Sequence, residues 1–225
     1  MEYSVVIDAG HGGADNGAIY NGRKEKDDNL RLALAVGDIL SRNGVDVTYT
    51  RVDDTYDTPF EKATMGNNSG ADLFLSIHRN SGPEPNTSKG VETLVFNNSG
   101  IKASIAENIN SNLSKMGYGN RGVIERPNLV VLKRTKMPAV LVEAGFINND
   151  DDNRLFDEKF EETAQAIAQG VLDTLGETKV SEADDENKME NEIYRVQVGA
   201  FKNLENAVLM EQKLRKEGYN TFIVY

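Results

Sequence analysis

Residues 3–13 read Tyr3-Ser4-Val5-Val6-Ile7-Asp8-Ala9-Gly10-His11-Gly12-Gly13, an apolar run that ends in a glycine-rich turn carrying a histidine. A nearly continuous apolar run is typical of a strand that is buried on both faces of a parallel sheet. The glycines allow a tight turn and a close approach of the backbone. We therefore expect a buried strand from Tyr3 to Asp8, with His11 just beyond its end.

Similar runs recur along the first 175 residues and alternate with segments of helical period. The strands expected on this basis are Tyr3–Asp8, Val45–Thr50, Leu73–Ile77, Val91–Phe96, Leu129–Leu132 and Val140–Val142. Three helices are expected: one capped by Asp27 or Asp28 and ended by Asn43-Gly44, one from Ile101 to Met116, and one from Phe160 to Leu175. Such alternation predicts an α/β fold with a twisted, mostly parallel sheet flanked by helices on both faces.

The composition excludes several classes of protein. The chain has 225 residues, 39% of them hydrophobic, and 36 acidic against 25 basic residues give it a net charge of −11. This acidity argues against a nucleic-acid partner, and no apolar run approaches the ~18 residues of a membrane span. The sequence contains no Cys, which excludes disulfides, thiolate metal sites and cysteine nucleophiles.

A change in composition divides the chain. Residues 176–192 carry seven acids and two lysines with hardly any large apolar residue, so we expect a linker there. The predicted domains are therefore residues 1–175, this linker, and residues 193–225. The last part reads as a small β-α-β unit with segments Ile193–Val198, Leu204–Lys216 and Thr221–Tyr225. A unit below about 40 residues rarely folds alone, so it should dock elsewhere, pair with a copy of itself, or be partly disordered.

The two histidines of the chain occupy matching places, because His11 and His78 each follow a predicted strand. The ends of neighbouring parallel strands lie side by side, and imidazole is a common ligand of zinc. Each histidine could equally be a hydrogen-bonded loop residue, and spacing alone does not decide between the two interpretations.

A catalytic zinc usually has a third protein ligand. Glu25 precedes the first predicted helix and follows His11 by 14 residues, so its carboxylate could complete the site. Asp15, Asp27 and Asp28 are alternatives. An acidic residue at this place also commonly pairs with the positive end of the helix dipole.

A further carboxylate, Glu143, ends the apolar run Val140–Val142. A charged side chain at the edge of an apolar core needs an ion-pair or hydrogen-bond partner, or else has a functional role. If Glu143 lies over a metal, it can take a proton from water and deliver it to a leaving amine. The structural alternative is an ion pair with Lys133, Arg134 or Lys136.

Four motifs follow one another along the chain: Asp8-Ala9-Gly10-His11-Gly12-Gly13, Glu25-Lys26-Asp27, Ser76-Ile77-His78-Arg79-Asn80 and Pro138-Ala139-Val140-Leu141-Val142-Glu143-Ala144-Gly145-Phe146-Ile147. In this order they resemble the zinc-dependent N-acetylmuramoyl-L-alanine amidases of the amidase-3 type, over about residues 3–175. The resemblance implies that His11, Glu25 and His78 bind zinc (Zn²⁺) and that Glu143 is the catalytic residue. It also implies a peptidoglycan substrate, cut between N-acetylmuramic acid and L-Ala. A zinc peptidase of the stem peptide and a non-catalytic wall-binding protein are the competing hypotheses.

The resemblance also concerns residues outside the four motifs. The resemblance places Arg121-Gly122 and Leu132 near the cleft, as wall residues. At Arg79 the sequence departs from the family, in which a small residue is usual between His and Asn. Arg79 is expected either to bind a carboxylate of the stem peptide or to face solvent.

The tail has a resemblance of its own. The segment Ile193-Tyr194-Arg195-Val196-Gln197-Val198-Gly199-Ala200-Phe201 is similar to the sporulation-related (SPOR) repeat that binds peptidoglycan. Two such units normally form one domain and this chain supplies one, so we predict a homodimer through the tails. No secretory signal is visible at Met1-Glu2-Tyr3-Ser4. Either the protein stays in the mother-cell cytoplasm until lysis, as autolysins of spore formers in the resembled family do, or a leader has been removed. The similarity of the tail to the sporulation-related repeat favours the first.

Overall fold

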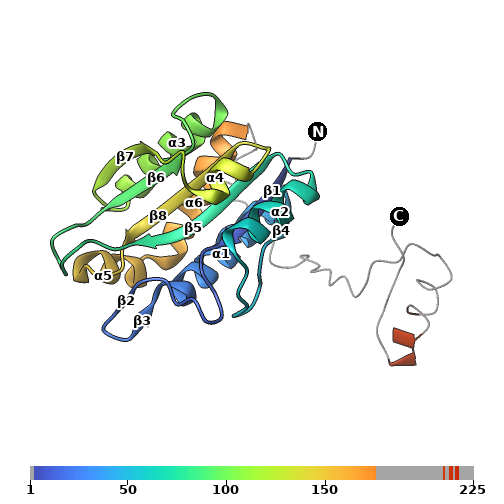
Figure 1. The fold of residues 1–225 in the computed structure, drawn as a ribbon, viewed down its shortest axis with the longest axis horizontal. Helices are drawn as coiled ribbons and strands as arrows, with labels where there is room; N and C mark the ends of the chain where they lie inside the picture. Colours follow the sequence, from blue (N-terminus) through green and yellow to red (C-terminus); the bar gives the residue numbers. More distant parts are fainter. Residues whose placement is uncertain (1–2, 176–209, 211–212, 215, 218–225) are drawn as a thin grey trace, which may run out of the picture. The chain divides into compact units, whose positions relative to one another are not determined.

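The computed structural model describes residues 3–175, 210, 213–214 and 216–217. The chain divides into two compact units, Met1–Val180 and Ser181–Tyr225. Figure 1 shows the first unit as a sheet with helices packed against it. The predicted linker, the strands of the tail and the dimer that they would form lie outside the described residues, so these expectations remain predictions.

Within the described residues, six strands form the main sheet in the order β4-β1-β5-β8-β6-β7 (Figure 1). Their bounds are Ser4–Ala9 (β1), Asp46–Tyr49 (β4), Leu73–Asn80 (β5), Val91–Val95 (β6), Asn120–Glu125 (β7) and Ala139–Phe146 (β8). Every neighbouring pair is parallel except β6 and β8, which are antiparallel. The expected mostly parallel sheet is confirmed.

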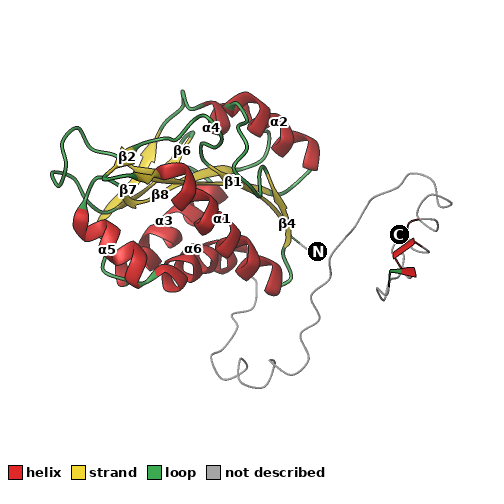
Figure 2. Cartoon of the chain, turned by 90° about the horizontal axis from the view of Figure 1, so that it is seen from below, coloured by secondary structure: helices red, strands yellow, loops and turns green. Residues whose placement is uncertain are grey.

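Helices cover both faces of this sheet, as expected (Figure 2). Their bounds are Glu25–Arg42 (α1), Pro59–Ser69 (α2), Ile101–Lys115 (α3), Val130–Arg134 (α4), Asp150–Glu158 (α5) and Phe160–Leu175 (α6). We call the side covered by α1, α3 and α6 the α1 face; it holds the larger apolar core. The side covered by α2 and α4 is the α2 face, and it holds a smaller cluster. None of the helices described is long and apolar enough to cross a membrane.

Several elements differ from the expectation. Leu129–Leu132 was expected as a strand, but α4 begins at Val130 and buries Leu132 against the α2 face. A short apolar run has the same appearance in a strand and in a buried helix. Helix α1 begins at Glu25 after Lys24, so the predicted caps Asp27 and Asp28 lie inside its first turn. The edge strand β7, the helices α2 and α5, and the short hairpin of β2 (Ile19–Tyr20) and β3 (Arg23–Lys24) were not predicted.

Alternation along β5 sends neighbouring side chains to opposite faces of the sheet. Phe74 belongs to the cluster on the α2 face, whereas Leu75 and Ile77 belong to the core on the α1 face. The period of two continues to the end of the strand. It places His78 on the α2 face and Arg79 on the α1 face.

Both expectations for Arg79 are therefore wrong, because the side chain neither faces solvent nor reaches the side of the sheet that carries His78. Arg79 is 2% exposed. Its Nη1 donates to Asp28 Oδ2 at 2.7 Å and its Nη2 to Asn153 Oδ1 at 2.8 Å. The guanidinium lies 4.1 Å from the centre of the Phe156 ring. Arg79 thus joins β5 to the first turn of α1 and to α5.

We predict that Arg79→Ala lowers the free energy of unfolding by about 3–5 kcal/mol, because it leaves the buried Asp28 carboxylate without one of its arginine partners. The matched control is Arg154→Ala. Arg154 pairs with Asp151 at 3.0 Å, but both side chains are more than half exposed, so the cost should stay below about 1 kcal/mol. Urea denaturation of the full chain measures both. Equal losses for the two variants would contradict the structural role of Arg79.

Candidate metal centre and active site

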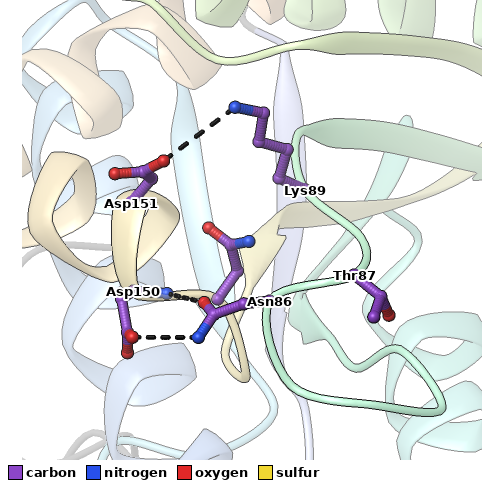
Figure 3. Close-up of a pocket in the computed structure, with 6 residues that line it drawn as sticks. Asn86, Thr87, Lys89, Asp150 and Asp151 are labelled. Carbon is purple, nitrogen blue, oxygen red and sulfur yellow. Dashed lines mark hydrogen bonds and ion pairs between the residues drawn. The ribbon is translucent and has the colours of Figure 1, made fainter.

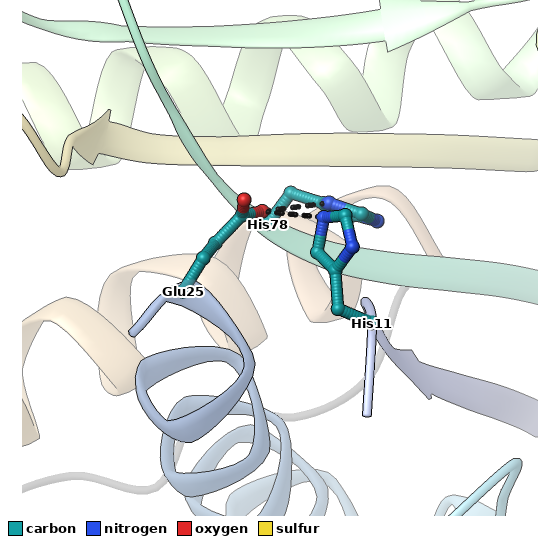
Figure 4. Close-up of side chains that lie close together, drawn as sticks. All are labelled: His11, Glu25 and His78. Atoms are coloured by element: carbon teal, nitrogen blue, oxygen red, sulfur yellow. Dashed lines mark hydrogen bonds and ion pairs between the residues drawn. The ribbon is translucent and has the colours of Figure 1, made fainter. Parts of the chain in front are cut away.

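The structure brings His11, Glu25 and His78 together (Figure 4). Each offers one ligand atom, and these atoms all lie within 4.8 Å of one another. Glu25 Oε1 is 3.2 Å from His11 Nε2 and 2.9 Å from His78 Nδ1. Side chains from the turn after β1, the start of α1 and the end of β5 therefore converge on one point.

The parallel pairing of β1 and β5 places the two histidines side by side. Ala9 pairs with Ile77, and the Gly10 N–H donates to the Ile77 carbonyl at 3.0 Å. A Cβ on Gly10 would lie only 2.3 Å from the His78 ring, so only glycine lets the turn pass this close to the imidazole. His11 then adopts a positive φ of 60°, which turns the chain at the end of the strand.

Glu25 is buried and held by hydrogen bonds as well as by the histidines. Its Oε2 accepts from the Ala18 N–H at 2.9 Å, and its Oε1 accepts from Asn29 Nδ2 and the Arg79 N–H, each at 3.2 Å. Burial by itself would raise the pKa of Glu25, but hydrogen bonds and charges from both histidines hold this pKa well below its usual range. The carboxylate is thus fixed as an anion.

The other carboxylates considered as a third metal ligand do not lie between the two histidines. Asp15 Oδ2 lies 2.8 Å from His11 Nδ1, on the ring nitrogen that does not face Glu25, where it orients the imidazole. Asp28 pairs with Arg79 and Arg23. Asp27 is exposed. Of the four carboxylates considered from the sequence, Glu25 is the one that joins the histidines.

The charges around His11, Glu25 and His78 indicate which kind of ion the cluster can bind. Burial would lower the pKa of His11, but the carboxylates of Glu25 and Asp15 outweigh it and raise this pKa to about 9. A buried carboxylate between two imidazoles therefore favours positive charge at the point where they meet. Two nitrogens and one oxygen are also the donor set of many catalytic zinc sites, which keep a fourth position open. The described residues fit a divalent metal ion.

Glu143 lies beside this cluster on the same face of the sheet. Its Cα pairs with that of His78 on β5 and that of Glu92 on β6. Burial raises the pKa of Glu143 to about 7, although the positive charge of His78 partly opposes the shift. Among the described residues Glu143 Oε2 is buried without a hydrogen-bond partner, and no ion pair joins Glu143 to Lys133, Arg134 or Lys136. The structural alternative is thus not supported.

Sequence reasoning missed Glu92, although it has the same signature as Glu143, a carboxylate inside an apolar strand. Glu92 is 6% exposed. Its Oε1 accepts from Asn80 Nδ2 and its Oε2 from Arg121 Nε, both at 3.0 Å. Arg121 thus stands at the edge of the site. Leu132, the other wall residue implied by the resemblance, is buried in the cluster on the α2 face.

A separate hollow of about 370 Å³ lies beside the start of α5 (Figure 3). It is lined by Asn86, Thr87, Lys89, Asn149, Asp150 and Asp151. Asn86 Nδ2 donates to Asp150 Oδ2 at 3.0 Å, and the Asp150 N–H donates back to Asn86 Oδ1 at 2.8 Å. Asn86 and Asp150 thus satisfy each other, and no lining residue belongs to the histidine cluster, so the candidate site remains where β1 and β5 end and Glu143 lies on β8.

Comparisons with known proteins agree with this geometry. Residues 5–173 match the family model described as N-acetylmuramoyl-L-alanine amidase, and residues 190–225 match the SPOR domain. A sporulation-specific N-acetylmuramoyl-L-alanine amidase of Bacillus subtilis is 33% identical over 226 residues, which cover 98% of this chain and 84% of the relative.

Solved structures are similar over the first unit. An N-acetylmuramoyl-L-alanine amidase of Clostridium difficile 630 is 37% identical with a TM-score of 0.72, covering 78% of this chain and 97% of that one. The catalytic domain of the amidase CwlV of Bacillus (Paenibacillus) polymyxa is 36% identical with a TM-score of 0.71, covering 77% and 98%. By sequence and by fold, this chain belongs to the N-acetylmuramoyl-L-alanine amidase family.

Proposed function

We propose that this chain is a zinc-dependent autolysin that hydrolyses the amide bond between N-acetylmuramic acid and the L-Ala of the stem peptide. The observation that carries the proposal is the convergence of two imidazoles and a carboxylate beside the buried Glu143, whose Oε2 has no hydrogen-bond partner among the described residues. The family match over residues 5–173 supports the choice of substrate.

His11, Glu25 and His78 would hold the zinc ion. When bound, zinc supplies a Lewis acid that polarises a carbonyl and acidifies water. The protein prepares this position in advance, because Asp15 orients the His11 ring and three hydrogen bonds hold Glu25. Such supporting groups commonly raise metal affinity by 10- to 100-fold.

Glu143 acts as the general base and then as the general acid. Its unpaired Oε2 takes a proton from the attacking water, whose oxygen forms a bond to the lactyl carbonyl carbon. The C–N bond then breaks, and Glu143 returns the proton to the nitrogen of L-Ala, which leaves as a free amine. A pKa raised to about 7 suits a group that must both accept and release a proton near neutral pH.

The proposal also covers where the protein acts and what its tail binds. The name of the Bacillus subtilis relative, a sporulation-specific amidase, supports action on the wall when the mother cell lyses. The SPOR match over residues 190–225 supports binding of peptidoglycan by the tail. The homodimer through the tails remains a prediction, which sedimentation of the full chain would test.

We predict that removal of metal by a chelator abolishes hydrolysis of purified peptidoglycan and that added Zn²⁺ restores it. Elemental analysis should find one zinc per chain. Glu25→Ala should lose the metal, because it removes one of three ligands. Asp27→Ala is the matched control, since Asp27 is an exposed acid in the same helical turn, and it should keep the metal. Full activity in metal-free protein would overturn the zinc assignment.

We predict that Glu143→Gln lowers turnover by about 10²–10⁴-fold, because the amide cannot carry the proton. The variant should keep its zinc. Exposed Glu107 on α3 offers the control Glu107→Gln, which should leave turnover unchanged. New amino termini on digested peptidoglycan provide the measurement. They should be L-Ala only; other termini would indicate a stem-peptide peptidase, and near-normal release by Glu143→Gln would show that its role is misassigned.

A further inference from the structure

Arg121 on β7 takes no part in the proposed reaction, yet the structure holds it at the edge of the site. Its side chain is 42% exposed, and its Nε lies 3.0 Å from Glu92 Oε2. Its guanidinium carbon lies 5.0 Å from the centre of the Phe146 ring. An arginine that is oriented by a carboxylate and an aromatic ring, and is still open to solvent, is preorganised to bind something else.

The contacts of Arg121 lie on the face of the sheet that carries Glu143. Glu92 pairs directly with Glu143 across β6 and β8. The register between β5 and β8 shifts after Glu143, so that Phe146 pairs with Asn80, and Gly145 at the shift has a φ of 82°. A bulge of this kind re-aims the following side chain. After the shift the Phe146 ring lies under the Arg121 guanidinium.

The guanidinium is only partly used. Arginine and carboxylate commonly pair through two parallel hydrogen bonds, but Arg121 gives Glu92 its Nε alone. The other oxygen of Glu92 already accepts from Asn80 Nδ2. Across the described part of the chain, Nη1 and Nη2 of Arg121 have no partner, so two donors of the guanidinium remain available next to Glu92, the strand neighbour of the proposed base.

Charge indicates the kind of group that these donors would bind. Residues 1–175 carry a net charge of −8, and Glu92 and Glu143 stand side by side. An anionic substrate group would be repelled here unless a cation received it. Strands lie about 4.8 Å apart, and an extended peptide advances about 3.4 Å per residue. The Arg121 guanidinium reaches over β6 to Phe146 on β8, so it lies within a few residues' length of a substrate bound at Glu143.

We infer that Arg121 is a specificity-determining residue that binds a carboxylate of the stem peptide next to the L-Ala whose amide is cleaved. This inference rests on the proposed function and adds to it a preference for acidic stems over amidated ones. The competing explanation is that Arg121 only neutralises Glu92, in which case its loss would affect every substrate alike.

The test uses two soluble substrates that differ by one charge, N-acetylmuramoyl-L-alanyl-D-glutamate and the compound with its α-carboxylate replaced by a carboxamide. The kcat and KM of the zinc-loaded full chain are measured for the native protein, Arg121→Gln and Arg121→Lys. Arg126→Gln is the matched control, since Arg126 is an exposed arginine that directly follows β7. Zinc content is measured for each protein.

We expect the native protein to prefer the carboxylate substrate by about tenfold in kcat/KM, the size of one charge-assisted contact at a partly exposed site. Arg121→Gln should remove this preference through KM while leaving the carboxamide substrate and the zinc content nearly unchanged. Arg121→Lys should restore part of it, and Arg126→Gln should retain all of it. Equal losses on both substrates, or no preference in the native protein, would overturn the inference.

A binding measurement separates this inference from the proposed function. The same two compounds are titrated against Glu143→Gln and against the double variant with Arg121→Gln. Tighter binding of the carboxylate that disappears in the double variant supports the inference even if the native protein cleaves neither compound, which would contradict only the proposed reaction. Equal dissociation constants in Glu143→Gln would overturn the inference whatever the native protein cleaves.

Discussion

A carboxylate buried between two imidazoles is the interaction on which the rest of the site depends. Glu25 is an anion inside the protein because His11 and His78 meet it at one oxygen and three further hydrogen bonds hold its carboxylate. That meeting requires β1 and β5 to be parallel neighbours, a glycine at position 10, and a helix that begins at Glu25 itself. The mostly parallel sheet thus serves to bring two strand ends and one helix start to a single point.

Strand β5 fixes the start of α1 through contacts on both faces of the sheet. On the α2 face His78 contacts Glu25, while on the α1 face the Arg79 side chain binds Asp28, three residues further along α1. The backbone N–H of Arg79 also donates to Glu25. Two successive residues of one strand therefore set the position of the first turn of α1. Arg79 thus belongs to the framework that holds the candidate site.

Periodicity predicted the buried strands and three helices, because these depend on local apolar patterns. The four residues of the candidate site followed from the resemblance of the motifs to a known family, since spacing alone left both the metal ligands and Glu143 open. These patterns did not predict the elements whose conformation depends on contacts with residues distant in the sequence. Polar β7 lies at the sheet edge, and the run at Leu129–Leu132 has no feature that separates strand from helix. By contrast, the face of the sheet on which Arg79 lies does follow from the alternation along β5, and this could have been inferred from the sequence. The contact of Glu92 with Arg121 joins residues 29 apart, and no local pattern encodes it.

The antiparallel strand β6 has an evolutionary consequence. Because β6 runs against β8, its first residues pair with the last residues of β8, near Glu143. The connection from β5 to β6, residues 81–90, consequently lies at the same end of the strands as His78 and Glu143. Insertions or deletions in this connection would reshape the surroundings of the cleft without displacing any residue that performs the chemistry. The reversal of β6 and β7 against the other four strands of the sheet gives the scaffold a place where selectivity can diversify while the reaction is inherited unchanged.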